Sequence, residues 1–329
     1  MDGPTLEGFA MGAVASIGCG LFVLVFVESR RRLKSSATSP AKQQIERVPR
    51  DHNPTTTSAL PQPTPLPTPH ADLSLPDFSM THFRYSLQRI GDSPDDNCDA
   101  VCAANKALRF AVSDGASQSF NSGLWAQLLV NSWAESSGRA TIDSLASGCA
   151  ARWLAETRHE VSKVPNNDLL ITKMKNGSSA TFGGVRWVAD AGSDGFWEAI
   201  VVGDVLLIVT ELDATGQATV RMTVPVETLA DFPTSPDQVS TSIPHLARRS
   251  TTIHLSHRPG IGFALLTDAV ARYAVALCTR GVELSSVFPF IGDGDAQFSN
   301  WITSLRQSGQ IDDDDSTVLF VQTFENRKE

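Results

Sequence analysis

The sequence AVSDGASQSF, residues 111–120, reads as a short apolar strand that ends in Asp114 and Gly115 and then passes into small polar residues. A charged side chain at the last step of a buried strand is costly unless something compensates the charge. Asp-Gly is a common turn dipeptide, so one explanation is a tight turn. The other is a divalent cation, because such ions bind carboxylate and backbone carbonyl oxygens together. The rest of the chain has to decide between these alternatives.

The composition is that of a globular protein with an acidic surface. The chain has 329 residues, is 41% hydrophobic and carries a formal net charge of −9, which suits one or two domains with a sizeable core. The acidic balance argues against nucleic acid as the main partner, because phosphate binding requires clustered Lys and Arg. The five cysteines show no paired spacing and no clustered His. This indicates reduced thiols rather than zinc ligands or disulfides.

The N-terminal part of the chain predicts a membrane anchor. Residues 9–27, FAMGAVASIGCGLFVLVFV, carry no charge and are numerous enough to cross a hydrocarbon core as a helix. Basic residues follow this run at 30–34, and none precedes it. The basic flank therefore faces the cytoplasm, whereas a cleaved signal peptide would have its basic residues before the run. We expect residues 1–34 to form a single-pass anchor in the cell membrane, in contact with the lipid bilayer, with the following domain in the cytoplasm.

Residues 35–80 have the composition of a disordered linker. Pro and Thr dominate this segment and large apolar side chains are few, so it cannot bury enough surface to fold. A coil of this length spans on the order of 40 Å, and proline stiffening extends it. The segment is interpreted as a tether, with docking of its PxxP sequences to a partner as the alternative.

Residues 81–329 predict one α+β domain. Strand-like apolar runs come in consecutive groups, with segments of helical periodicity between the groups. The strand-like runs cover residues 82–90, 108–115, 179–190, 196–213, 251–257, 261–269 and 316–324. The helical segments cover residues 122–136, 142–161, 270–281 and 296–309. This order predicts antiparallel sheets covered by helices rather than a βαβ repeat. The domain contains no GxGxxG sequence and no P-loop, so a nucleotide-binding fold is not indicated.

Acidic residues recur where apolar strands begin or end. They are Asp99, Asp114, Asp204, Asp268 and the run Asp312–Asp315. Each alone is adequately explained as a turn or strand-end residue, and the run alone as a solvated loop. Together, carboxylates at the ends of several strands would converge at one rim, where they repel each other unless a cation neutralises them.

The motifs NCDA, AVSDGA, ATFGG, VVGD, LLTDA and DDDDSTVLFV, in this order, resemble those of the metal-dependent type 2C Ser/Thr protein phosphatases. The nearest likeness is to the divergent bacterial branch, and it covers residues 81–329. The resemblance implies a four-layer αββα sandwich, in which two antiparallel sheets are flanked by helices. It also implies a site for two Mg²⁺ or Mn²⁺ ions at one edge of the sandwich.

Position by position, the resemblance implies that Asp114 bridges the two metal ions and that the carbonyl of Gly115 binds one of them. Asp268 and one Asp of the final run would complete the ligands of the second ion. The last motif of the family ends in Thr. With Thr317 in that place, the ligand is Asp314.

The resemblance also assigns supporting roles and leaves one position open. Asp99 would hold a metal-bound water, and Asp204 would help to hold a weaker third ion. The family's phosphate-binding Arg has no match, because Pro94 occupies the nearest position. Arg84 or Arg89 would have to substitute for it from the preceding strand.

The expected function is that of a membrane-tethered phosphatase acting on phosphoserine and phosphothreonine in cytoplasmic proteins. Two divalent ions would activate a shared water for attack on phosphorus, which suits a chain with neither a Cys-x5-Arg loop nor a Gly-x-Ser-x-Gly elbow. The alternative is a binding or scaffold module that keeps the fold but has lost activity, because Ala116 and Val205 also depart from the motifs. A metal-dependent nuclease is disfavoured, since the chain lacks a basic track.

Overall fold

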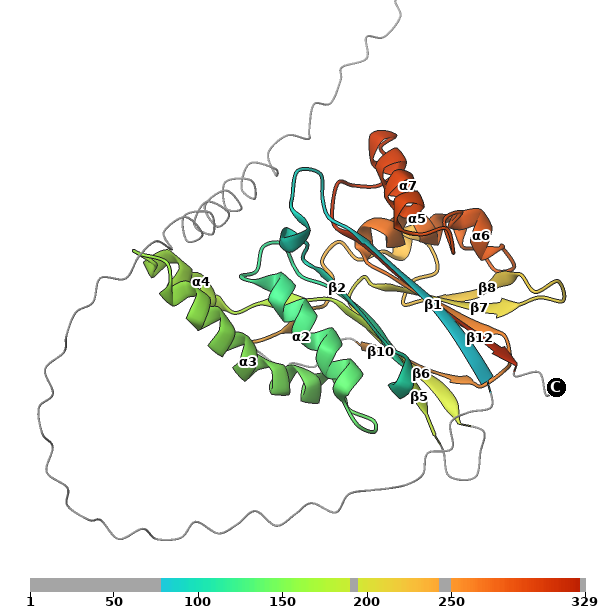
Figure 1. Ribbon diagram of the computed structural model, residues 1–329, viewed down its shortest axis with the longest axis horizontal. Helices are drawn as coiled ribbons and strands as arrows, with labels where there is room; N and C mark the ends of the chain where they lie inside the picture. Colours follow the sequence, from blue (N-terminus) through green and yellow to red (C-terminus); the bar gives the residue numbers. More distant parts are fainter. Residues whose placement is uncertain (1–77, 190–194, 243–249, 326–329) are drawn as a thin grey trace, which may run out of the picture. The chain divides into compact units, whose positions relative to one another are not determined.

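The computed structural model describes residues 78–189, 195–242 and 250–325 (Figure 1). The predicted membrane helix at residues 9–27 and nearly all of the predicted linker lie outside these ranges. Within them, no helix is both long and apolar enough to cross a membrane. The first strand begins at Phe78, so the last three residues assigned to the linker belong to the folded domain.

Two five-stranded sheets, in which every strand pair is antiparallel, form the centre of the domain. The first sheet has the order β1 (Phe78–Leu87), β12 (Ser316–Glu325), β11 (Ile261–Leu266), β7 (Leu206–Leu212), β8 (Ala218–Val224). The second has the order β10 (Ser250–Ser256), β6 (Phe196–Val202), β5 (Phe182–Val188), β3 (Arg109–Asp114), β2 (Asp99–Ala104). A two-stranded sheet joins β4 (Ser179–Ala180) and β9 (Val239–Ser240).

Helices cover the outer face of each sheet (Figure 1). The second sheet is covered by α2 (Ser122–Glu135) and α3 (Ile142–Ser162), with α4 (Asp168–Asn176) packed on α3. The first sheet is covered by α5 (Asp268–Leu277), α6 (Leu284–Val287) and α7 (Asp295–Gln307). Three short 3-10 helices complete the described elements: η1 (Pro94–Asp96), η2 (Asn105–Ala107) and η3 (Leu229–Asp231).

Three hydrophobic cores separate the four layers, and strand β11 shows why. All six of its residues are buried. Because successive side chains of a strand point to opposite faces, Ala264 and Leu266 enter the core beneath α5 and α7. Phe263 and Leu265 enter the core between the sheets. The predicted α+β sandwich of two antiparallel sheets flanked by helices is thereby confirmed.

The strand-like run at residues 196–213 is not a single strand. Gly203, with a φ of 86°, turns the chain between β6 and β7, and these two strands belong to different sheets. A charged residue in the middle of an apolar run is the sequence feature that coincides with this crossing. Asp204 therefore lies in a connection between the two sheets rather than within a strand.

Antiparallel pairing gathers the predicted acidic residues at one end of the sandwich. Asp114 ends β3 directly opposite Asp99, which begins β2. In the other sheet, β11 runs into Asp268, and Asp314 lies two residues before β12, the antiparallel neighbour of β11. Asp204 lies in the β6–β7 connection, which joins the two sheets. The sheet topology thus brings residues far apart in sequence to a common edge.

We expect Trp197→Ala to lower the free energy of unfolding by about 3–5 kcal/mol, as measured by denaturant titration of the full chain. Trp197 is 0% exposed, and its ring lies 5.1 Å from Phe263 of the first sheet and 6.3 Å from Phe110 of the second. Met222→Ala, at a 41% exposed position of β8, should cost about 0.5 kcal/mol or less. Equal costs would contradict the inter-sheet core.

Candidate metal centre

The Asp114–Gly115 dipeptide continues the sheet and does not form a tight turn. The Gly115 N–H donates to the carbonyl of Cys98 at 3.1 Å, and Gly115 forms an antiparallel bridge with Ala180. A Cβ at Gly115 would lie 2.6 Å from the carbonyl carbon of Ser122 and 2.9 Å from the oxygen of Cys98. The backbone beside Asp114 therefore packs directly on the start of α2, and the turn explanation of this sequence is wrong.

Asp114 lies among other carboxylates. Burial raises its pKa well above the ordinary range, and the charges of Asp99, Asp268, Asp204 and Asp314 raise it further. Like charges directly opposite each other on neighbouring strands destabilise a sheet, and Asp99 and Asp114 are such a pair. All five predicted acidic positions therefore interact electrostatically, although they come from both sheets.

Asp99 is held by one hydrogen bond and keeps one free oxygen. Its Oδ2 accepts from Thr267 Oγ1 at 2.8 Å, whereas its buried Oδ1 has no partner among the described residues. Burial raises the pKa of Asp99 well above its usual range, with a further contribution from Asp315. Thr267 also accepts from the Thr317 N–H at 2.9 Å, which ties the end of β11 to the start of β12.

Asp268 and Asp204 form a second part of the cluster. Burial raises the pKa of Asp268 to about 7, with further contributions from the charges of Asp204 and Asp314. Asp204 is 5% exposed, and burial raises its pKa. Its buried Oδ1 has no partner within the part of the chain that the structure describes. Both Asp99 and Asp204 thus keep an unsatisfied buried oxygen, which native proteins normally avoid.

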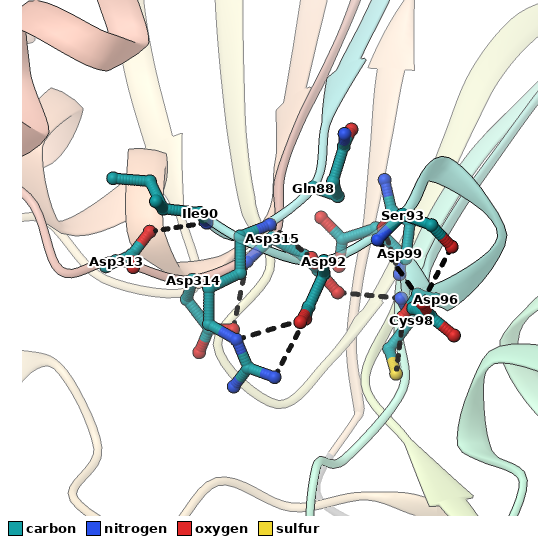
Figure 2. Close-up of polar contacts among 12 residues, drawn as sticks. Gln88, Ile90, Asp92, Ser93, Asp96, Cys98, Asp99, Asp313, Asp314 and Asp315 are labelled. Carbon is teal, nitrogen blue, oxygen red and sulfur yellow. Dashed lines mark hydrogen bonds and ion pairs between the residues drawn. The ribbon is translucent and has the colours of Figure 1, made fainter. Parts of the chain in front are cut away.

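Three residues of the final acidic run, Asp313 to Asp315, make different hydrogen bonds (Figure 2). Asp315 accepts from the N–H groups of Arg89 at 2.9 Å and Cys98 at 2.7 Å, using both carboxylate oxygens. Asp313 accepts from the Ile90 N–H at 3.0 Å. Asp314 accepts a hydrogen bond from the adjacent Asp315 N–H at 2.9 Å. Its charge contributes to the raised pKa of Asp114 and Asp268. The assignment of Asp314 as the metal ligand, made from the Thr317 register, stays a prediction.

Arg306 of α7 positions this run and was not found by sequence reasoning. Its side chain is 3% exposed. It donates to the backbone carbonyls of Asp314 and Gln88, the latter at 3.0 Å, and to the side-chain hydroxyl of Ser316 at 3.1 Å. A single Arg within a helical pattern gives no signal of such a role, because its partners belong to other elements.

The two arginines predicted to bind phosphate lie in different surroundings. Arg89 donates through Nε and a terminal nitrogen to Asp92 Oδ2 at 3.1 and 2.8 Å, so its guanidinium is engaged beside the cluster. Arg84 is exposed on β1. Burial raises the pKa of Cys102, and the positive charge of Arg84 opposes this effect. The structure places neither guanidinium free and facing the carboxylates.

The donor set suits a hard divalent cation, but it is not closed around one. Carboxylate and carbonyl oxygens are the ligands that Mg²⁺ and Mn²⁺ prefer, and the unpartnered oxygens of Asp99 and Asp204 are donors of this kind. Among the described residues, however, no three His, Cys, Asp or Glu side chains already converge as a metal-binding group. To hold an ion, these side chains would have to move toward one another.

In metal-free protein, we expect Asp114→Asn to raise the stability of the fold by about 1–3 kcal/mol. The substitution removes one negative charge from a group of mutually repelling carboxylates. Thermal unfolding of the full chain in EDTA measures the effect. Asp312→Asn, at an exposed position of the final run, is the matched control and should leave the melting temperature unchanged. A lower melting temperature for Asp114→Asn would contradict the repulsion.

The stability of metal-free protein should decrease as the pH rises from about 4 toward 7. The pKa of Asp268 is about 7 in the folded chain, whereas an unfolded carboxyl group titrates near 4. Between these values the folded state binds more protons than the unfolded state, so deprotonation disfavours folding. Urea unfolding in EDTA at several pH values measures this slope, and saturating Mn²⁺ should abolish it. Increasing stability across that window would be inconsistent with the raised pKa.

Comparisons with known proteins place the chain beside phosphatases. No family model and no curated protein matches the sequence. Among solved structures, the catalytic domain of the serine/threonine protein phosphatase PstP, in complex with two manganese ions, has 15% identity and a TM-score of 0.45 over 75% of this chain and 99% of that one. The Mycobacterium tuberculosis phosphatase PstP/Ppp gives the same values. PppA of Pseudomonas aeruginosa has 18% identity and a TM-score of 0.44, over 74% and 98%.

Proposed function

We propose that the chain is a metal-dependent phosphatase that hydrolyses phosphoserine and phosphothreonine esters of proteins. The observation that carries this proposal is the cluster of carboxylates from both sheets, which raise one another's pKa at one end of the sandwich. Such a cluster is costly in isolation. A pair of divalent cations compensates it and supplies a reason for its presence.

In this proposal Asp114, Asp268 and Asp314, with the carbonyl of Gly115, hold two Mg²⁺ or Mn²⁺ ions. Such ions, when bound, lower the pKa of a shared water and neutralise charge on the phosphoryl oxygens. The extended backbone at Gly115 presents its carbonyl beside Asp114. Asp314 is steadied by Arg306, which donates to its backbone carbonyl.

The remaining two carboxylates, Asp99 and Asp204, are proposed to hold the attacking water and a third metal ion, respectively. Thr267 fixes Asp99 through Oδ2, which leaves Oδ1 to accept a hydrogen bond from the attacking water. Asp204, whose Oδ1 is also free, lies beside Asp268 and is proposed to help to hold a third, weaker ion. The phosphate-binding roles of Arg84 and Arg89 stay predictions.

The cellular setting is also part of the proposal. The uncharged run at residues 9–27 and the basic residues after it support a single-pass anchor in the cell membrane. The Pro- and Thr-rich segment would then tether the domain on the cytoplasmic side, within reach of phosphorylated proteins. Its substrates are therefore proposed to be membrane-proximal phosphoproteins.

A catalytically degenerate scaffold is the second candidate, favoured by Pro94 in place of the family's Arg and by the open donor set. Calorimetric titration with Mn²⁺ separates the two, because a scaffold that has lost the chemistry should bind no pair of ions. The phosphatase should bind at least two per chain.

The full chain in detergent should hydrolyse a phosphothreonine peptide and p-nitrophenyl phosphate in the presence of Mn²⁺ or Mg²⁺. Asp114→Ala and Asp314→Asn should each lower the rate on the order of 10²–10³-fold, because metal stabilisation of the transition state is worth several kcal/mol. Asp312→Asn should leave the rate unchanged. Full activity in excess EDTA would rule out this function.

A further inference from the structure

The carboxylate cluster needs a cation that can face a substrate, and two of the nearby arginines, Arg89 and Arg306, are engaged in other contacts. Pro94 stands where the motif order would place an Arg. Arg89 is bound to Asp92 through two nitrogens. Arg306 is buried and donates to the loop that carries Asp314. A phosphate dianion approaching the cluster would therefore find these three positions without an available guanidinium.

Arg272 is placed differently. It lies on α5 one helical turn after Asp268, and residues four apart lie on the same side of a helix. It is exposed. The positive charge of Arg272 acts favourably on the carboxylates of Asp204 and Asp268. Its guanidinium is thus near these two carboxylates and open to solvent.

The guanidinium of Arg272 lies over the face of an aromatic ring. The central carbon of the Arg272 guanidinium lies 5.5 Å from the centre of the Phe232 ring. Phe232 directly follows η3 and packs against the core beneath α5. A cation stacked on a ring keeps the N–H groups at its edge free. Within the described residues, no hydrogen bond or ion pair occupies those groups of Arg272.

The segment that carries Phe232 also reaches the Asp204 turn. A Cβ on Gly203 would lie 2.6 Å from the carbonyl oxygen of Asp237, so the β8–β9 connection packs closely on this turn. The β8–β9 connection therefore supports Arg272 through Phe232 and also packs on Gly203, the residue before Asp204. This support fixes the position of a side chain that would otherwise be a free surface residue.

We infer that Arg272, stacked on Phe232, binds the phosphoryl oxygens of the substrate and takes the place of the cation missing at Pro94. The inference rests on the proposed phosphatase function. A planar guanidinium with free edge donors fits two phosphoryl oxygens at once. The metal-bound side of the phosphoryl group would face Asp204 and Asp268, and Arg272 would contact it from the solvent side.

The test measures phosphate binding and steady-state kinetics in the Mn²⁺-loaded full chain. We expect Arg272→Ala to weaken inorganic phosphate, measured by calorimetry, and to raise the KM for a phosphothreonine peptide, each about 10-fold or more. The kcat should change by about 2-fold or less if the contact is equal in the ground and transition states. Arg272→Lys should recover part of the loss, and Phe232→Leu should show a smaller loss than Arg272→Ala.

Arg158→Ala, at an exposed position of α3, is the matched control and should alter neither quantity. Unchanged phosphate affinity in Arg272→Ala, while the unaltered chain remains active, would overturn the inference and leave the phosphatase function intact. A larger loss in Arg89→Ala than in Arg272→Ala would overturn it in favour of Arg89. Additional Mn²⁺ bound by Arg272→Ala at unchanged phosphate affinity would also overturn it, because Arg272 would then replace a metal ion. If the unaltered chain neither hydrolyses phosphoesters nor binds phosphate, both proposals fail.

Discussion

The repulsion among buried carboxylates at one end of the sandwich is the constraint on which the candidate site depends. Asp99 and Asp114 face each other across two paired strands, and Asp268, Asp204 and Asp314 reach the same region from the other side. Burial raises the pKa of Asp99, Asp114, Asp204 and Asp268. Neighbouring carboxylates raise the pKa of Asp99, Asp114 and Asp268 further. A fold without a functional reason to keep these charges together would gain stability by replacing them.

The scaffold offsets part of this cost by fixing the surrounding backbone. Asp315 uses both oxygens to hold the N–H groups of Arg89 and Cys98, which joins β12 to the end of β1 and the start of β2. Thr267 links the end of β11 to the start of β12 and steadies Asp99. These contacts leave the remaining oxygens unpaired, as a preorganised site for cations would require.

The large apolar cores stabilise the fold enough to offset the repulsion among the carboxylates at this end of the sandwich. The inter-sheet core and the two cores beneath the helices are continuous along the strands, so a cluster at the strand ends removes no central packing. The same geometry allows Arg272 to approach from α5 without crossing a sheet.

Local sequence signals were sufficient to identify the acidic residues and most of the helices and strands. Helical periodicity located α2, α3, α5 and α7, and apolar runs that meet Asp located Asp114, Asp268 and Asp314, because these signals are local. Strand β8 was missed, since Arg221 and its Thr neighbours interrupt the apolar pattern, and α4 was missed because none of its residues is buried. The membrane anchor remains a prediction from composition.

Which of these residues lie together depends on the tertiary fold and could not be predicted from the sequence. The split of residues 196–213 between two sheets, the pairing of Asp99 with Asp114, and the contacts of Asp315 and Arg306 all join segments that are distant in sequence. Such contacts depend on strand order and register, which no local pattern contains. The role of Arg272 could not be predicted from the sequence for the same reason. It depends on Phe232 and Asp204, which lie in two other connections of the fold.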